Sequence, residues 1–327
     1  MNTPLVTDDL DSELVEPILT LADAARAADG VAPLSEHTVL RVRHGAPAGS
    51  GRFHLLRDPS VPDRLVGFAF IERSEDEPDS GEVVVDPAHR GRGYGSALLR
   101  SVHEDAGPRG VRVWAHGRTP GAVSVAQAAG WSSVRELHKM RMPLRDLGPE
   151  VPGGPWKAPE LPEPELRPEV AEKVLIRPFV VGQDEQAWLD ANARAFAAHP
   201  EQGSLTLDDL LQREIEDWFD PRGFFVAVTN TGAIAAYHWT KVHSDGAGLS
   251  DDEPVGEVYV VGVDPAWRGT GLGRALTLAG LRYLRDAGLP WVHLYVDGDN
   301  RTAVRLYQTL GFSMWDTDVM YAPGRGA

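Results

Sequence analysis

The sequence DPAHRGRGYGSALL at residues 86–99 recurs without a gap as DPAWRGTGLGRALT at residues 264–277. Each copy follows a run of β-branched residues and precedes a helical pattern, so each predicts a strand, a tight glycine turn and a helix. Both halves then continue with a strand-like run, a helix and a Gly-aromatic pair, Gly130-Trp131 and Gly311-Phe312. The chain is therefore predicted to contain two copies of one α/β unit.

A proline-rich segment separates the two copies. It carries eight prolines between Pro143 and Pro168. Proline cannot donate a hydrogen bond to a β-ladder and disfavours helix in the residue before it, which predicts a semi-rigid extended linker. A chain of 327 residues is long enough for two domains with a core each. We expect a first domain over residues 1–145, the linker over 146–172 and a second domain over 173–327.

Composition excludes several classes of function. The formal net charge is −16 at pH 7 and the pI is near 5.1, so binding to nucleic acid or to an anionic membrane is not expected. The chain has no cysteine, which excludes disulfides, zinc thiolates and a cysteine nucleophile and fits a reducing cytosol. It begins without a leader-like pattern, and no apolar run approaches the roughly 20 residues that span a bilayer. We expect a cytoplasmic protein.

The duplicated turn has the chemistry of a pyrophosphate site. A strand that ends in Arg-x-x-Gly-x-Gly and opens a helix points several free N–H groups at one place, where the helix end and the arginine add positive charge. A dinucleotide fold would need Gly-x-Gly-x-x-Gly after the first strand, whereas these turns follow the fourth strand and read Gly-x-Gly-x-Gly. Neither turn continues as Gly-Lys-Ser/Thr. A tight turn without a ligand is the simpler alternative, and the repetition disfavours it.

The two turns and the order of the elements around them resemble the GCN5-related N-acetyltransferase (GNAT) family. The resemblance implies an α/β fold of two tandem GNAT domains, each a mixed, mostly antiparallel sheet flanked by helices, with acetyl-CoA as co-substrate. It also implies that the turn, the strand before it and the start of the last helix bind acetyl-CoA. In the first half these residues are Val83, Val84, Val85, Gly91, Arg92, Gly93, Tyr94, Gly95 and Ser96. In the second half they are Val261, Gly262, Val263, Arg268, Gly269, Thr270, Gly271, Leu272, Gly273, Arg274, Asn300, Arg301, Thr302, Ala303, Val304 and Arg305.

The second half carries a more specific resemblance. The sequences HPEQG at 199–203, HWTKVH at 238–243, GEVYVVGVDP at 256–265 and LYVDGDN at 294–300 are similar to the mycothiol synthases of actinobacteria. That similarity implies a small-molecule acceptor, the cysteinyl amine of a glucosaminyl-inositol. The acceptor contacts implied by it are Glu36, Glu201, Lys241, Glu257 and Tyr295. The first half matches at the level of the GNAT family alone.

Amide formation from a thioester needs a base for the amine and an acid for the leaving thiolate. Glu257 lies on the predicted strand before the second turn, where a carboxylate can take the proton. Tyr307 lies on the last predicted helix, where a phenol can be the acid. The resemblance implies the same two roles. Alignment of the halves places Asp79 opposite Glu257, in the stretch Glu75 to Ser80 that we expect to be a loop, and Ala126 opposite Tyr307. The first half is therefore predicted to be catalytically silent.

Other interpretations stay open at this point. The acceptor can be another small amine, such as an aminoglycoside or a polyamine, or the chain can be an acyl-CoA sensor without turnover. The histidines show no zinc spacing, since His238 and His243 are five residues apart on a predicted strand. We expect no metal and a monomer.

Overall fold

The computed structural model describes residues 3–75, 77–197, 200–244, 246 and 253–324. The chain forms two compact units. The first comprises residues 1–138, 297–299 and 316–327, and the second comprises residues 139–296 and 300–315.

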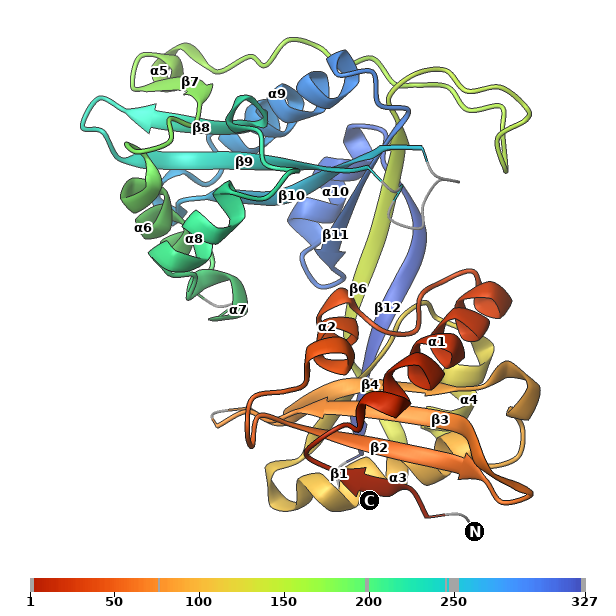
Figure 1. The fold of residues 1–327 in the computed structure, drawn as a ribbon. Coiled ribbons are helices and arrows are strands. Elements are labelled where there is room, and N and C mark those ends of the chain that lie inside the picture. Colours follow the sequence, from red (N-terminus) through yellow and green to blue (C-terminus); the bar gives the residue numbers. More distant parts are fainter. Residues whose placement is uncertain (1–2, 76, 198–199, 245, 247–252, 325–327) are drawn as a thin grey trace. The chain divides into compact units, whose positions relative to one another are not determined.

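The first unit is a sheet with helices on both faces (Figure 1). Its elements in chain order are β1 (Leu5–Thr7), α1 (Val15–Asp29), α2 (Glu36–His44), β2 (Gly51–Asp58), β3 (Val61–Glu72), β4 (Asp79–Val85), α3 (Tyr94–Ala106), β5 (Val111–Ala115) and α4 (Pro120–Ala128). The strand order is β1-β2-β3-β4-β5, followed by the last strand of the chain, β12 (Ser313–Pro323). The pairings are antiparallel except that of β4 with β5.

The alternation of apolar residues along the strands gives this sheet two cores. Phe53, Phe68 and Phe70 face α1 and α2, with Ile18 fully buried between them. On the opposite face, residues such as Ile71 pack against α3 and α4. Because successive side chains of a strand point to opposite faces, one run of apolar residues in β3 supplies both cores.

The second unit repeats this plan. Its elements are α5 (Pro168–Ala171), β7 (Val174–Pro178), α6 (Glu185–Ala195), α7 (Pro200–Gly203), α8 (Leu207–Glu214), β8 (Phe224–Thr229), β9 (Ile234–His243), β10 (Val255–Val263), α9 (Leu272–Asp286), β11 (Trp291–Asp297) and α10 (Arg301–Thr309). The strand order is β7-β8-β9-β10-β11, followed by β6 (Trp131–Pro143). Strands β10 and β11 are parallel, and β7 to β10 are antiparallel. The predicted fold, a mixed and mostly antiparallel sheet used twice, is confirmed.

The compact units and the sequence repeats differ in their last strand. Strand β6 belongs to the first repeat, and its end, from Lys139, lies in the second unit. Strand β12 belongs to the second repeat, and it pairs with β5 of the first unit, with Val319 opposite Ala115. In the strand order, β12 thus follows β5 and β6 follows β11, so that each sheet is continued by the last strand of the other repeat. The boundaries 1–145, 146–172 and 173–327 remain our proposal for the extent of the repeats.

One local expectation is wrong. The stretch from Glu75 to Ser80 was expected to be a loop, but Asp79 and Ser80 begin strand β4. Asp79 is opposite Val111 of β5, and its buried carboxylate is paired with Arg109 at 3.1 Å. Acidic residues favour loops because they need polar partners, and this arginine supplies the partner inside the sheet.

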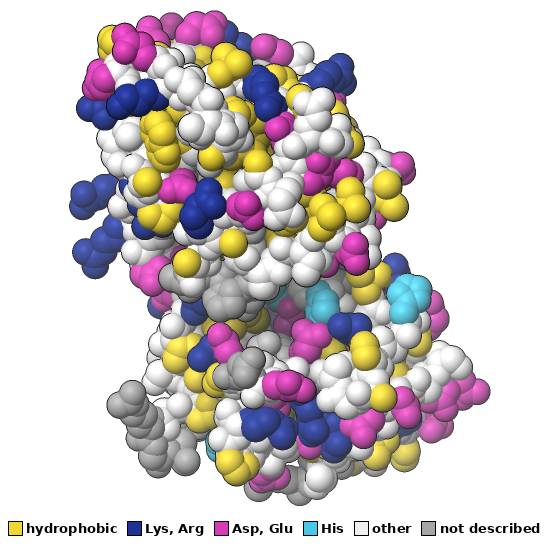
Figure 2. Space-filling model, turned by 90° about the vertical axis from the view of Figure 1, so that its left-hand side faces the viewer, with side chains coloured by type: hydrophobic (Ala, Val, Ile, Leu, Met, Phe, Trp, Pro, Cys, Tyr) yellow, Lys and Arg dark blue, Asp and Glu magenta, His cyan; other side chains and the backbone are white. Residues whose placement is uncertain are grey.

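None of the described helices combines the length and the apolar character that a bilayer crossing requires. On the face drawn in Figure 2, acidic and basic side chains are interspersed over the surface.

Candidate active site

The site in the second unit is created where two parallel strands separate. The registered pairs of β10 with β11 are Gly256 with Val292 and Glu257 with His293. Strand β10 continues to Val263 and stays paired with β9 on its other side. Beyond Glu257, the backbone groups of β10 therefore face an open side of the sheet. An extended ligand can add to such an edge as a strand would.

A bulge follows Glu257 directly. The register of β10 against β9 shifts between Val258 and Val260. A bulge bends its strand and re-aims the groups beside it, which is why bulges recur next to active sites. The bulge thus lies between Glu257 and the rest of β10. Val261, Gly262 and Val263, the residues predicted to bind the pantetheine arm, follow it on the same strand.

The glycine turn ends this strand. Gly269 and Gly271 have φ values of 76° and 93°, in the left-handed region that glycine adopts without strain. Gly271 begins α9 without a side-chain cap, so the first N–H groups of the helix are left for a ligand. Arg268 donates to the carbonyl of Ala195 at 3.3 Å, and Arg274 donates to Thr309 Oγ1 at 3.3 Å. These are the features of a phosphate cradle.

Helix α10 carries the predicted acid. Asn300 caps it, its Oδ1 accepting from the N–H of Ala303 at 3.2 Å. Tyr307 is buried, lies edge-on to Phe312 and shares a core with Val258 of β10. Burial raises the pKa of Tyr307 to about 12. The phenol therefore keeps its proton at neutral pH, as a donor to a leaving sulfur must.

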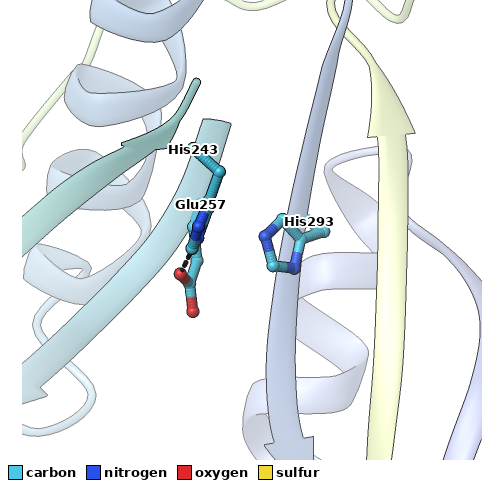
Figure 3. A group of neighbouring side chains, drawn as sticks. All are labelled: His243, Glu257 and His293. Carbon is cyan, nitrogen blue, oxygen red and sulfur yellow. Dashed lines mark hydrogen bonds and ion pairs between the residues drawn. The ribbon is translucent and has the colours of Figure 1, made fainter. Parts of the chain in front are cut away.

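Glu257 is the central ionisable group of the site (Figure 3). Its Oε2 lies 2.6 Å from Nε2 of His243, and its side chain is about nine-tenths buried. Burial alone would raise the pKa of the Glu257 carboxyl, but the hydrogen bond with His243 and the positive charge on neighbouring groups hold the pKa below its usual value. Glu257 thus carries a buried carboxylate whose surroundings favour the ionised form.

His293 lies on the other side of Glu257. Its side chain is 3% exposed, and no hydrogen-bond partner of its Nε2 is found among the described residues. Burial lowers the pKa of His293 to about 4, against the raising effect of Glu257. His293 is therefore neutral at pH 7. An unpartnered buried polar atom beside a base is a natural contact for an incoming ligand.

The predicted acceptor contacts are brought together in part. Lys241 is the cross-strand partner of Glu257 on β9, and its ammonium lies 4.6 Å from the ring centre of Trp218. Tyr295 lies on β11, is 45% exposed and packs edge-on to His293. Lys241 and Tyr295 thus flank Glu257 on the two neighbouring strands. The side chains of Glu36 and Glu201 lie outside the described part of the structure.

The site also has the composition of a metal site. One possible ligand atom from each of His243, Glu257 and His293 lies within 4.8 Å of the others, and transition metals bind such groups. The surroundings disfavour a cation, because Lys241 and Lys139 act on His293 with positive charge. The absence of a metal remains a prediction. The sequence did not show this cluster because its members come from three strands, and His243 and His293 lie on β9 and β11, which are separated by β10.

The first unit has a cavity of about 440 Å³ at its own glycine turn. It is lined by most of the residues predicted to bind acetyl-CoA there, namely Val83, Val84, Val85, Gly91, Gly93, Tyr94, Gly95 and Ser96. Arg92 is exposed and donates to the carbonyl of Ala88 at 3.5 Å. The arginine equivalent to Arg268 is Arg90, and both of its terminal nitrogens lie 2.7 Å from the carboxylate of Asp29. That carboxylate neutralises the charge offered to a phosphate.

The reactive positions of the first unit are occupied differently. Asp79 is held by Arg109, and Ala126 is the seventh residue of the nine-residue helix α4, as Tyr307 is of α10. Strands β4 and β5 stay paired as far as Glu82. Glu82 accepts from the backbone N–H of Ser35 and contacts His116 at 2.7 Å. In the second unit the parallel pairing ends at Glu257, which the sequence alignment matches with Asp79. In the first unit the pairing ends three residues later, at Glu82, so the alignment did not point to Glu82.

Comparison with known proteins supports both units. The acetyltransferase (GNAT) family model matches residues 187–312, and a GNAT domain model matches residues 49–131. A mycothiol acetyltransferase of Nocardiopsis dassonvillei is 78% identical over 99% of this chain and 98% of its own length. The chain belongs to the mycothiol acetyltransferase family. A second member, from Thermobifida fusca, is 60% identical over 98% of both chains.

Solved structures show the same tandem arrangement as this mycothiol acetyltransferase family member. A GCN5-related N-acetyltransferase of Sphaerobacter thermophilus superposes with a TM-score of 0.67 at 25% identity, over 98% of this chain and 95% of that one. A tandem GNAT protein from the clavulanic acid pathway gives a TM-score of 0.65 at 21% identity, over 99% and 98% of the two chains. These likenesses establish the fold. With the family membership, they make this chain an acetyl-CoA-dependent N-acetyltransferase.

Proposed function

We propose that this enzyme transfers the acetyl group of acetyl-CoA to the cysteinyl amine of a glucosaminyl-inositol, which yields mycothiol and free CoA. The family membership and the site in the second unit support this acceptor. Another small amine as the acceptor, or a sensor without turnover, is not favoured, because the similar curated proteins are named mycothiol acetyltransferase. In the reaction an N–C bond forms and the C–S bond of the thioester breaks.

One observation carries the proposal, namely that Glu257 stands where β10 leaves β11. A pantetheine arm that adds to the open edge of β10 brings its thioester to this point. The buried carboxylate of Glu257 then takes a proton from the acceptor amine, which becomes a nucleophile. The bulge after Glu257 offers backbone N–H groups to the thioester carbonyl, where charge develops in the transition state.

The remaining parts of the second unit complete the reaction. The N–H groups after Arg268 hold the pyrophosphate of CoA, with the first turn of α10, from Asn300 to Arg305, beside the open edge. Tyr307 gives its proton to the sulfur as the C–S bond breaks. Lys241 and Tyr295, on either side of Glu257, contact the hydroxyl-rich acceptor, as do Glu36 and Glu201.

The first unit is proposed to retain an acetyl-CoA cavity without chemistry. Asp79 and Glu82 are both engaged by basic partners, and Ala126 has no proton to give. We further propose that the enzyme acts as a monomer in the cytoplasm, without a metal, and that it binds neither nucleic acid nor membrane.

A direct assay tests the proposal. The enzyme is mixed with acetyl-CoA and cysteinyl-glucosaminyl-inositol, and released CoA is measured with a thiol-independent readout such as chromatography. Glucosaminyl-inositol without the cysteinyl group, spermidine and an aminoglycoside serve as matched acceptors. CoA release that requires the cysteinyl amine is the expected result. Equal or faster release with one of the other amines would overturn the proposed acceptor.

A further inference from the structure

The base of the proposed reaction is held by a second side chain. We propose that His243 is the positioning residue of Glu257: its Nε2–H donates to Oε2, which keeps the carboxylate ionised and leaves Oε1 to take the amine proton. This inference rests on the proposed function, in which Glu257 is the base. It assigns a role to His243 beyond the two groups that carry out the proton transfers.

The direction of the hydrogen bond follows from the charge of Glu257. An ionised carboxylate has acceptors and no donor, so a contact of 2.6 Å between Oε2 and Nε2 requires the proton to be on the histidine. A hydrogen bond to the charged form favours that form. Burial works in the opposite direction, since Glu257 is only 8% exposed. The hydrogen bond from His243 therefore offsets part of the cost of burying the charged Glu257 carboxylate.

Two lysines near the site lie over aromatic rings. On β9, the ammonium of Lys241 lies over the rings of Trp218 and Tyr259, at 4.6 and 5.5 Å from their centres. On β6, the ammonium of Lys139 lies over the ring of Tyr295, at 6.0 Å. The positive charge of Lys241 acts on Glu257 through space and lowers its pKa.

The remaining neighbour, on β11, is His293, which is neutral at pH 7 because burial lowers its pKa to about 4. Of His243, His293 and Lys241, which all act on Glu257, His243 is the one that holds its carboxylate by a hydrogen bond. The side chain of His243 is also more exposed than that of Glu257, at 21% against 11%. Substitution at His243 consequently disturbs less of the core than substitution of a fully buried residue.

Two substitutions at His243 separate its hydrogen bond from its ring. His243→Gln keeps an N–H donor of similar reach, so kcat and the pH profile are expected to stay within a few-fold of wild type. His243→Phe keeps a ring without the donor, so that burial of Glu257 is opposed only by the charge of the remaining neighbours, such as Lys241. The acidic limb of the kcat/KM profile is expected to move to higher pH by about one unit or more, with kcat at pH 7 down roughly tenfold and KM for acetyl-CoA unchanged.

The controls keep the test decisive if a variant folds poorly. His243→Asn is polar and too short to reach Oε2, so it should repeat the shift of the Phe variant without the added apolar ring. His37→Gln changes an exposed histidine of the first unit and should leave the profile unchanged. An acidic limb that stays in place in both His243→Phe and His243→Asn would overturn the inference, as would equal losses in the Gln and Phe variants.

A measurement without acceptor separates this inference from the proposed function. The carboxyl carbon of Glu257, assigned by its loss in Glu257→Gln, is titrated by 13C NMR in the full chain. The Glu257 pKa should rise in His243→Phe and not in His243→Gln. Wild-type enzyme that releases no CoA with the cysteinyl acceptor would overturn the proposed function, while this titration still reports on His243. A Glu257 pKa that is the same in all three proteins would overturn the positioning role.

Discussion

Asp318, nine residues from the end of the chain, lies 3.1 Å from Nδ1 of His116 through its Oδ2. The opposite nitrogen of the same ring lies 2.7 Å from Glu82. The last strand of the second repeat therefore completes a buried charge cluster in the first unit. Burial alone would lower the pKa of His116, but the two carboxylates outweigh it and raise the pKa to about 9.

This cluster makes the stability of the first unit depend on pH. Because the folded-state pKa is above the unfolded value of about 6.5, the stabilisation is complete below pH 6.5 and is lost as the pH rises through about 9. The loss is on the order of 3 kcal/mol. Urea unfolding followed by hydrogen exchange in β5 and β12 should show a decline between pH 7 and pH 10. In Asp318→Asn the decline should be smaller and begin at lower pH, and an unchanged slope would contradict the assignment.

Removal of the Tyr307 hydroxyl tests the acid. Tyr307→Phe keeps the ring in its core beside Phe312 and removes the proton that the leaving sulfur needs. We expect kcat to fall about 10²-fold, with KM for both substrates within a few-fold of wild type. Tyr283→Phe is the matched control. Tyr283 lies on α9, and its hydroxyl donates to Asp220 in the turn before β8. Similar losses in both variants would point to a general effect on packing.

Loss of Arg268 tests the origin of phosphate binding in a chain of net charge −16. Arg268→Gln should weaken acetyl-CoA binding by roughly tenfold at low salt, because local charge and helix-end N–H groups must overcome the field of the whole protein. Arg90→Gln is the matched change in the first unit, where Asp29 already neutralises the side chain. Calorimetry should resolve a smaller effect there. The opposite order would mean that the first turn is the main acetyl-CoA site.

A β-carbon at Gly271 tests the cradle itself. The φ of 93° strains any other residue, so Gly271→Ala should destabilise the second unit by about 1 kcal/mol and weaken acetyl-CoA binding as well. Gly232→Ala has a φ of 85° in the β8–β9 turn, away from the site, and should show the destabilisation alone. Thermal unfolding and calorimetry of the same two proteins separate the two effects.

The sequence predicts most of the fold because the decisive signals are local. The glycine turns, the β-branched runs and the Asn-Thr-Gly hairpin turn at 230–232 each specify their own backbone. The exchange of β6 and β12 could not be predicted, since the pairing of β12 with β5 joins residues about 200 positions apart and no local signal specifies it. The strand at Asp79 could not be predicted either, because its ion-pair partner Arg109 lies thirty residues further along the chain.

The candidate site shows the same limit. Glu257 and Tyr307 follow from their spacing to the turn, and they remain predictions as base and acid. The neighbours that set the pKa of Glu257 come from β9 and β11. Spacing along the sequence does not tell which residues pair across a sheet. His243 and His293 were therefore visible in the sequence only as scattered histidines.

The most direct test of the account is the pH dependence of CoA release by wild type and Glu257→Gln with cysteinyl-glucosaminyl-inositol. An α-amino group has a pKa near 8, so a base is needed below that pH and is dispensable above it. We expect Glu257→Gln to be slower than wild type by about 10²-fold or more at pH 7, with a difference that narrows toward pH 9.5, and Asp79→Asn in the first unit to match wild type throughout. Equal rates for wild type and Glu257→Gln at pH 7, or a larger loss in Asp79→Asn, would contradict it.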